Sequence, residues 1–393
     1  MRLSIISVCS RVSTADKRAG APGSGAPDGL PDTLDGVRAR IDAIDDAILV
    51  LLNQRAACAL KVGVIKQATS DPAAAPVFYR PEREAQILTR LQADNPGPLG
   101  GADVTRLFRE IISCCLNLEQ PLTIAYLGPP GTYTETAALT QFGHFASTRP
   151  VGTIDEVFRA VETEAVHYGV VPVENSTEGV VNHTLDCFMT SPLRVCAEIE
   201  LPIHHAFMVS AAHNGEAITE IVSHAQSLAQ CRGWLDAHHR GVPRTSVSSN
   251  AEAARLVAER TDAGAIAGEM AASRYGLKVL ATRIEDDANN KTRFLVIGRQ
   301  HVGPSGRDKT SILVSTRNEP GALYRVLEPF ERHGISLTRI ETRPVRGASW
   351  TYVFFIDFDG HESEPRIGSV LAEVRKVALE VRSLGSYPQA IVQ

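Results

Sequence analysis

The sequence lacks the cysteine spacing of a metal site or of a disulfide framework. Its seven cysteines include one adjacent pair, Cys114 and Cys115, and the others are scattered over the 393 residues. Zinc sites and disulfide scaffolds place cysteines at short, regular intervals. We therefore expect no bound metal, and a reducing cytoplasm as the location.

Strong net charge and long apolar runs are also missing. The formal net charge is −5, so any anion site must be built from locally placed Arg and Lys. No apolar run approaches the roughly 20 residues of a membrane span. The N-terminal residues lack the apolar core and small-residue cleavage site of a signal peptide. We expect neither nucleic acid nor a membrane as a partner.

What is present divides into a tail and three domains. Residues 1–32 contain a stretch rich in Gly, Ala and Pro that we expect to be disordered. Residues 33–121 have a helical pattern, and residues 122–300 alternate short apolar strands with helices, which indicates an α/β domain. After a break, residues 309–393 have the pattern of strand, helix, two strands, helix and strand.

The first helix carries an apolar stripe with one basic interruption. The stripe has the spacing of a heptad seam and consists of Val37, Ile41, Ile44, Ile48, Leu51, Cys58, Val62 and Ile65. Arg55 stands in this seam, so either its side chain reaches solvent or a bound anion meets it. Lys66 falls within about 20° of the same helix face, and the two cations can hold a compact dicarboxylate. Arg38, about 25 Å before Arg55 along the helix, can reach only the equivalent site of an antiparallel partner. The pattern predicts a homodimer.

The second and third helices add further charged residues. Pro81 suits the first turn of a helix that begins near Arg80, and the third helix runs from about Val104 to Gln120. Glu119 lies one turn beyond Cys115 on the same helix face. Together with the first helix, this segment resembles the all-helical chorismate mutase family over residues 34–120. The resemblance depends on Arg38, Arg55, Lys66, the Arg83-Glu84 pair and the RLFREII stretch at 106–112.

That resemblance implies a role for each charged residue. Arg38 of the partner, Arg55 and Arg83 would hold the two carboxylates of chorismate, and Lys66 would contact the ether oxygen. Glu84 would accept from the ring hydroxyl, Arg80 would line the site, and Cys115 and Glu119 complete it. The rearrangement of chorismate to prephenate needs a folded substrate and positive charge near the breaking C–O bond, but no covalent catalysis. Glu119, where the family often has Gln, donates only when protonated, so either its surroundings raise its pKa or mutase activity favours lower pH.

Polar clusters follow the strands of the α/β segment. They are the turn Leu127–Tyr133, the run Gly169–Gly179 with Glu174, Asn175 and Ser176, the group Ser223–Gln226 with Gln230, and the stretch Asn289–Phe294 with Thr292 and Arg293. Ligands bind at the strand ends of open α/β sheets. The turn lacks the Lys-Ser/Thr ending of a P-loop and the dinucleotide glycine pattern, so we expect no nucleotide and no other cofactor.

These clusters, in this order, resemble the prephenate dehydratase family from about 122 to 298. The resemblance implies two α/β lobes similar to periplasmic binding proteins, one at about 122–200 plus 285–298 and the other between them. Thr292 would aid departure of the ring hydroxyl of prephenate. Glu174, Asn175, Ser176, Ser223 and Gln230 would position the substrate, and Arg293 would hold a carboxylate.

The last segment resembles the ACT domain of phenylalanine-regulated enzymes, which implies an α+β, ferredoxin-like fold. The matching stretches are Gly321, Ala322 and Leu323, and Glu341, Thr342, Arg343 and Pro344. The resemblance implies that L-phenylalanine binds there as an effector and inhibits by feedback.

The three resemblances together imply a bifunctional chorismate mutase/prephenate dehydratase of phenylalanine biosynthesis. Two alternatives stay open at this point. The helical domain could serve only to dimerise a dehydratase, or the chain could be an amino-acid sensor without catalysis.

Overall fold

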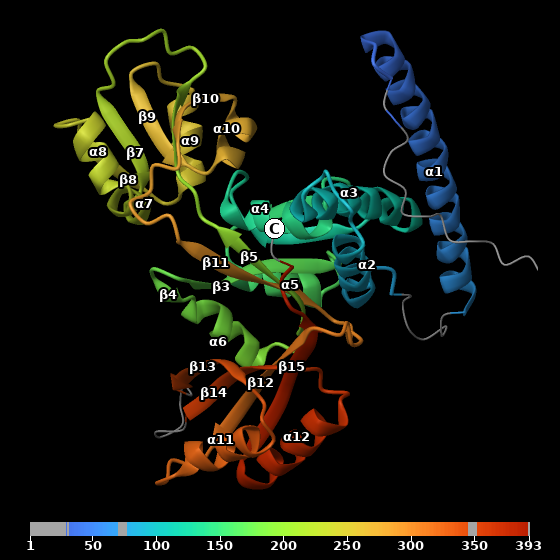
Figure 1. Ribbon diagram of the computed structural model, residues 1–393. Helices are drawn as coiled ribbons and strands as arrows, with labels where there is room; N and C mark the ends of the chain where they lie inside the picture. The colour runs from blue at the N-terminus through green and yellow to red at the C-terminus, as the bar shows by residue number, and fades with distance from the viewer. Residues whose placement is uncertain (1–28, 30, 70–76, 345–351, 392–393) are drawn as a thin grey trace, which may run out of the picture. The chain divides into compact units, whose positions relative to one another are not determined.

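The computed structural model describes residues 29, 31–69, 77–344 and 352–391, coloured along the chain in Figure 1. The expected disordered tail therefore lies almost wholly outside the described residues. By its contacts the chain forms two units, Met1–Gln54 and Arg55–Gln393, and each is described by itself.

Three helices form where the heptad pattern and Pro81 predict them. They are α1 (Leu34–Thr69), α2 (Pro81–Ala93) and α3 (Gly101–Glu119). Pro81 occupies the first turn of α2, where its missing N–H costs nothing. Helices α2 and α3 pack against each other, and Leu88 of α2 is fully buried.

The apolar stripe of α1 is exposed within the single chain. Ile41, Ile48 and Leu51 expose 50%, 47% and 62% of their surface. The stretch Leu34–Ala68 is also long enough to cross a membrane, and an 18-residue window within it has a mean hydropathy of 1.6, which we did not expect. From Asp42 to Lys66 inclusive, six charged residues interrupt the apolar residues of this stretch in the sequence. The apolar residues nevertheless belong to one continuous helix.

The first α/β lobe contains a sheet with the strand order β2-β1-β3-β11-β5, and β4 pairs with β3. Its elements are β1 (Thr123–Leu127), α4 (Tyr133–Phe142), β2 (Ser147–Val151), α5 (Ile154–Glu162), β3 (Tyr168–Asn175), β4 (Gly179–Val180), α6 (Asn182–Thr190), β5 (Arg194–Pro202) and β11 (Lys291–Gly298). Strand β11 returns from the second lobe and runs antiparallel to both β3 and β5. This return places Thr292 opposite Asn175.

The second lobe is a sheet of order β10-β6-β9-β7-β8. Its elements are β6 (Ala206–Ser210), β7 (Glu220–His224), α7 (Ala225–Gln230), α8 (Arg232–His238), β8 (Arg244–Val247), α9 (Asn250–Ala258), β9 (Ala263–Ala267), α10 (Glu269–Tyr275) and β10 (Leu277–Thr282). Small residues fill β9, all of it buried, which lets α9 pack closely on the sheet. The two sheets are formed by separate sets of strands, β1–β5 with β11 in the first and β6–β10 in the second.

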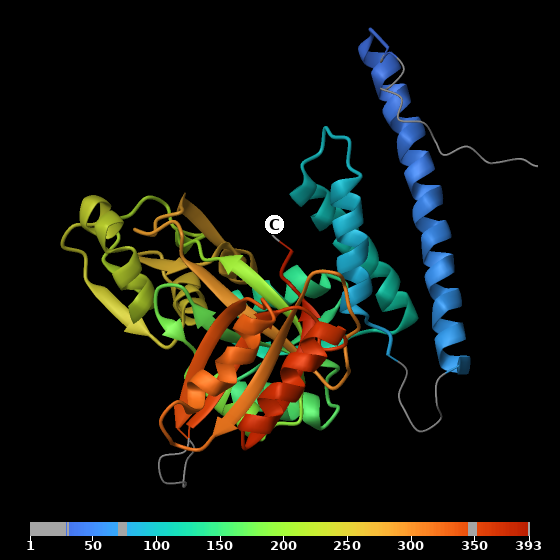
Figure 2. The same cartoon turned by 60° about the horizontal axis from the view of Figure 1, so that its bottom comes forward.

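The C-terminal domain has the element order that the sequence predicted. The elements are β12 (Asp308–Thr316), α11 (Ala322–Arg332), β13 (Leu337–Pro344), β14 (Tyr352–Asp359), α12 (Pro365–Val377) and β15 (Glu380–Pro388). They form an antiparallel sheet of order β13-β14-β12-β15, and Figures 1 and 2 show α11 and α12 together on one face of it. Apolar residues of the other face, including Leu313 and Phe355, join the core of the first lobe.

Candidate functional sites

A cationic cavity of about 490 Å³ lies among the helices of the Arg55–Gln393 unit. Seven of the eight residues predicted for the first site line it: Arg55, Lys66, Arg80, Arg83, Glu84, Cys115 and Glu119. Four of these seven are cations against two carboxylates. An anion therefore meets positive charge from α1, from the segment before α2 and from α2 itself.

Two cations of this cavity are fixed by hydrogen bonds. The Lys66 ammonium donates to the carbonyl of Phe78 at 2.9 Å and to the Glu119 carboxylate at 3.3 Å. The Arg55 guanidinium donates to the carbonyl of Ile111 at 3.3 Å. A long cationic side chain that is already fixed by hydrogen bonds loses less conformational freedom when an anion binds to it. The cavity is therefore preorganised for an anion.

Arg109 is a part of this region that the sequence analysis missed. Its Nε donates to Glu84 at 3.2 Å, and both side chains are less than a tenth exposed. Burial raises the pKa of Glu84, and the neighbouring Arg109 guanidinium opposes this rise. Arg109 could have been found by asking which cation pairs with a carboxylate on the buried face of α2.

The eighth predicted residue, Arg38, lies in the other unit. Its guanidinium is exposed and comes within 3.8 Å of the Asp35 carboxylate, one helical turn away. Its role at the cavity of a partner chain stays a prediction.

The second site centres on Thr292 at the start of β11. The Thr292 hydroxyl accepts a hydrogen bond from the Asn175 amide at 2.8 Å, and the same amide nitrogen donates to Asn290 at 2.9 Å. Asn290 also contacts the Ser176 hydroxyl at 3.4 Å and the Gln230 amide oxygen at 3.3 Å. The structure therefore brings four predicted residues together through a fifth, Asn290, to which the sequence analysis gave no role.

The lobes also face each other across a cavity of about 590 Å³. It is lined by Gly131 and Tyr133 of the predicted glycine-rich turn, by His204, and by Gly268 and Lys291. The Tyr133 hydroxyl lies 3.0 Å from the ring of His205, which in turn contacts Gln230 at 2.9 Å. These contacts connect the glycine-rich turn, through His205 and Gln230, to the hydrogen-bonded residues around Thr292, which we call the Thr292 group.

Ser223 is not open to a ligand in this geometry. It is fully buried, and its hydroxyl lies 2.7 Å from the carbonyl of Ile266 and 3.0 Å from the Asn250 side chain. The hydroxyl ties β7 to the neighbouring elements. Its direct contact with substrate stays a prediction.

Arg293 and Glu174 both contact the C-terminal domain. The Arg293 guanidinium donates to Glu198 at 2.9 Å, to Asp357 at 2.6 Å and to the Tyr387 hydroxyl at 3.0 Å. Neighbouring residues on a strand point to opposite faces of the sheet, so the side chains of Thr292 and Arg293 leave β11 on opposite sides. The guanidinium is paired with protein carboxylates, and its role in holding a substrate carboxylate stays a prediction. Glu174 pairs with Arg339 of β13 at 3.2 Å.

A third hollow, of about 230 Å³, lies at the start of α11. The predicted residues Gly321, Ala322 and Leu323 line it together with Tyr352 and Phe354. Thr342 and Pro344 pair across the sheet with these two aromatic residues. Arg343 instead donates twice to Asp186 of α6, at 2.8 Å, and its guanidinium is directed at the first lobe.

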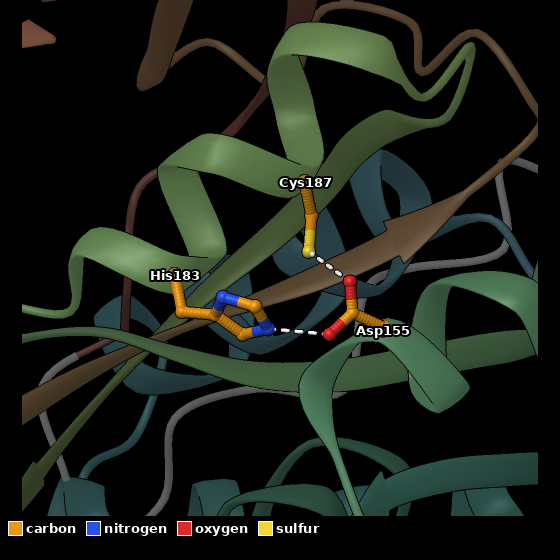
Figure 3. A group of neighbouring side chains, drawn as sticks. All are labelled: Asp155, His183 and Cys187. Carbon is orange, nitrogen blue, oxygen red and sulfur yellow. Dashed lines mark hydrogen bonds and ion pairs between the residues drawn. The ribbon is translucent and has the colours of Figure 1, made fainter. Parts of the chain in front are cut away.

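One cluster combines residue types that bind metals, and Figure 3 shows it. The ligand atoms of Asp155, His183 and Cys187 lie within 4.8 Å of one another. The His183 ring and the Cys187 thiol both point at the Asp155 carboxylate, and each bonds a different oxygen. Burial, reinforced by Asp155, raises the pKa of Cys187 to about 12, so the thiolate that a metal needs is scarce at neutral pH. The hydrogen bonds of His183 and Cys187 occupy both oxygens of the Asp155 carboxylate, and we assign no metal to this cluster.

Comparisons with known proteins match the three regions in turn. Residues 37–120 match the family described as Chorismate mutase type II, residues 124–302 Prephenate dehydratase, and residues 310–376 the ACT domain.

Whole-chain similarities extend across these regions. A protein of Pseudomonas aeruginosa named bifunctional chorismate mutase/prephenate dehydratase is 55% identical over 92% of this chain and 99% of its own length. One of the same name from Neisseria gonorrhoeae is 48% identical over 90% of this chain and 97% of its own. The solved structure of a prephenate dehydratase in complex with L-Phe, from Arthrobacter aurescens, has a TM-score of 0.64 at 34% identity and covers 68% of this chain and 90% of that one.

Proposed function

Because the chain belongs to the family of bifunctional chorismate mutase/prephenate dehydratases, we propose an assignment of its two activities to the two sites. The enzyme rearranges chorismate to prephenate and then removes water and carbon dioxide from prephenate to give phenylpyruvate, in phenylalanine biosynthesis. The mutase step belongs to the cationic cavity, and the dehydratase step to the Thr292 group between the lobes. The observation that carries the second assignment is the Asn175–Thr292 hydrogen bond.

In the mutase site, the positive charge holds a folded dicarboxylate. Arg55 and Arg83 bind the carboxylates of chorismate, while Lys66 and Glu119 approach the ether oxygen at which negative charge develops. Chorismate is a dianion, and a cavity with four cations suits it. Glu84 is held by Arg109, which supports a fixed acceptor for the ring hydroxyl. The reaction is unimolecular, so the site acts by orientation and electrostatics alone.

In the dehydratase site, Thr292 donates to the ring hydroxyl that leaves. The Asn175 amide nitrogen donates to the Thr292 oxygen, so the Thr292 hydrogen is directed elsewhere, toward a ligand. As the bond to the carboxylate carbon of prephenate breaks, its electron pair enters the ring and the C–O bond to the hydroxyl breaks. The carboxylate carbon leaves as carbon dioxide, and the departing hydroxide takes the proton of the Thr292 hydroxyl, which regains one from solvent water. Water is released, and the product gains an aromatic ring.

Replacing Thr292 tests this assignment with the mutase activity as an internal control. Thr292→Ala should lower dehydratase turnover by about 100-fold or more, since it removes a donor aimed at the leaving group. Thr292→Ser keeps the hydroxyl and should retain most of the rate. Mutase activity, measured from chorismate consumption on the same samples, should stay unchanged. Near-normal dehydratase turnover in Thr292→Ala would refute the assignment.

We also propose that α1 pairs with α1 of a second copy of the chain. The exposed apolar stripe, with Ile48 and Leu51 half exposed or more, is large for a surface left in water. This pairing also accounts for the span-like hydropathy of the helix, because the stripe becomes the core of a mutase domain. Light scattering should give twice the chain mass of 42.4 kDa. Ile48→Asp should lower it, and the matched control Asn53→Asp, on an exposed position outside the stripe, should not.

The C-terminal domain is proposed to be a ferredoxin-like ACT domain that binds L-phenylalanine at the hollow lined by Gly321 and Leu323. The related Arthrobacter aurescens structure holds L-Phe, which supports this ligand. Phenylalanine should raise the thermal midpoint and inhibit turnover, and an unchanged midpoint together with unchanged rates contradicts the proposal. We likewise propose that the two lobes resemble periplasmic binding proteins, and that the enzyme works in the cytoplasm.

One assay separates these proposals from the open alternatives. Chorismate is supplied, and prephenate and phenylpyruvate are followed with and without phenylalanine. A dehydratase with a purely structural helical domain would convert prephenate but not chorismate, and an amino-acid sensor would convert neither.

A further inference from the structure

Asn290 joins the two lobes at the dehydratase site. It lies just before β11 and is only 2% exposed. Its side chain contacts Asn175 and Ser176 at the end of β3 in one lobe, and Gln230 at the end of α7 in the other. A buried amide with three partners fixes the relative positions of those partners.

The direction of these hydrogen bonds is set by backbone amides. The N–H groups of Thr177 and Glu178 can only donate, and both point at the Asn175 side-chain oxygen, at 3.0 and 3.1 Å. The Asn175 nitrogen must then face Thr292 and Asn290, so the oxygen of Asn290 accepts. The nitrogen of Asn290 is left to donate to the Gln230 oxygen at 3.3 Å.

The same logic fixes His205 on the far side of Gln230. Because the Gln230 oxygen faces this group, the His205 Nε2 at 2.9 Å must carry the proton and donate. Burial lowers the pKa of His205, which favours a neutral ring with that one proton. The Tyr133 hydroxyl donates its single hydrogen to the carbonyl of His204 at 2.7 Å, and its oxygen lies 3.0 Å from the His205 Nδ1.

Gln230 is thereby left with its amide nitrogen directed away from both neighbours. That nitrogen is buried, and the described part of the chain offers it no hydrogen-bond partner. A buried amide N–H without an acceptor is unfavourable, whereas a bound dianion supplies acceptors. The N–H groups of Gln230 and the hydroxyl of Thr292 are both donors left over after every protein contact is assigned.

We propose that Asn290 and His205 are positioning residues of the dehydratase. They hold the Gln230 oxygen from two sides so that its N–H groups donate to an oxygen of the bound substrate, and Asn290 also holds the amide that orients Thr292. Neither residue touches the substrate. The inference rests on the proposed dehydratase function. It adds that Asn290 and His205 decide in which direction the Gln230 amide and the Thr292 hydroxyl donate.

Asn290→Asp tests the proposal with a change of one atom. The introduced carboxylate still accepts from Asn175 but faces the Gln230 oxygen with another acceptor, so the Gln230 amide should turn over. Dehydratase kcat/KM should fall by about 100-fold, and should recover as the pH is lowered, because a protonated carboxyl again donates to Gln230. Asn289→Asp, at the exposed neighbouring position, introduces the same charge and is the matched control with unchanged kinetics.

Two further variants test the route through Gln230. In a Gln230→Ala background, Asn290→Asp should cost little more, because the residue that it misorients is gone. His205→Gln, which offers an amide N–H, should keep more activity than His205→Leu. Rates are corrected for the enzyme-free reaction at each pH, and mutase turnover on each sample reports that the chain has folded.

The outcomes separate this inference from the function beneath it. If the wild-type enzyme does not convert prephenate, the dehydratase assignment itself fails. If the wild type is active but Asn290→Asp behaves like Asn289→Asp, shows no recovery in acid, or adds fully to Gln230→Ala, the positioning role is wrong while the dehydratase assignment stands.

Discussion

The buried charge cluster between the first lobe and the C-terminal sheet should be a determinant of stability, and Asp357→Asn tests this. Arg293 and Lys309 face Glu198 and Asp357, and these four side chains are between 2% and 11% exposed. The cluster is neutral, and the substitution leaves it with one uncompensated positive charge. Removing one partner of a buried pair costs about 3–5 kcal/mol. Arg293 keeps Glu198 and the Tyr387 hydroxyl, so we expect about 3 kcal/mol.

Urea unfolding followed by circular dichroism measures this loss. With a slope of about 3 kcal/mol per molar urea, the midpoint of the transition that includes the C-terminal domain should fall by about 1 M. Glu373→Gln removes a carboxylate of the same domain that pairs with Arg332 at the surface, and should leave the midpoint unchanged. Equal midpoints for the two variants would refute the reasoning.

The pH dependence of the same difference gives a second test. Burial opposes ionisation of Asp357, but the Arg293 guanidinium and the Ser311 hydroxyl outweigh it and hold the pKa of Asp357 below its ordinary value. A carboxyl with a lowered pKa in the folded state stabilises at pH values above its unfolded pKa, and this stability is lost as the pH falls through the folded pKa. The gap between wild type and Asp357→Asn should therefore shrink below about pH 4. A gap that stays constant into stronger acid contradicts this account.

Three further changes address the mutase and the effector site. Glu119→Gln can keep an acceptor for Lys66, which lies 3.3 Å from the Glu119 carboxylate, and adds an amide that can donate to the ether oxygen, so mutase turnover should not fall; a large loss of mutase turnover would show that the carboxylate itself is needed. Arg109→Leu leaves the Glu84 carboxylate buried without its cation, so we expect a loss of about 3 kcal/mol by urea unfolding and a weaker mutase, with dehydratase activity as the control. Gly321→Ala places a side chain where φ is +77° and 3.3 Å from Arg325; it should cost about 1 kcal/mol and raise the phenylalanine concentration needed for inhibition, as measured by dose–response.

The helical pattern of the sequence was enough to place two cations of the cationic cavity together. Arg55 and Lys66 are placed on one helix face by the helical period alone, and both line the cavity. Arg109 could not be assigned in this way, because its importance comes from a carboxylate on another helix, 25 residues away. Periodicity shows which residues share a face, but not which opposing side chain a buried charge will meet.

The dehydratase motifs were predicted as a group, and the structure divided them. Asn175 and Thr292 meet because β11 returns antiparallel beside β3. The same pairing directs Arg293 to the other face, where β14 and β15 supply Asp357 and Tyr387. The sequence stretch contains both residues side by side, and only the sheet separates Thr292, which contacts Asn175, from Arg293, which contacts the C-terminal domain.

The sequence by itself determined the three-domain order, the charged helix and the chemistry-bearing stretches, because periodicity, turn residues and polar strand ends are local properties. Tertiary structure alone decided the partners: Arg109 for Glu84, Asp357 for Arg293, and Asn290 between Asn175 and Gln230. These pairs join residues between 25 and 115 positions apart. Their geometry follows from the packing of whole elements, which no local pattern encodes.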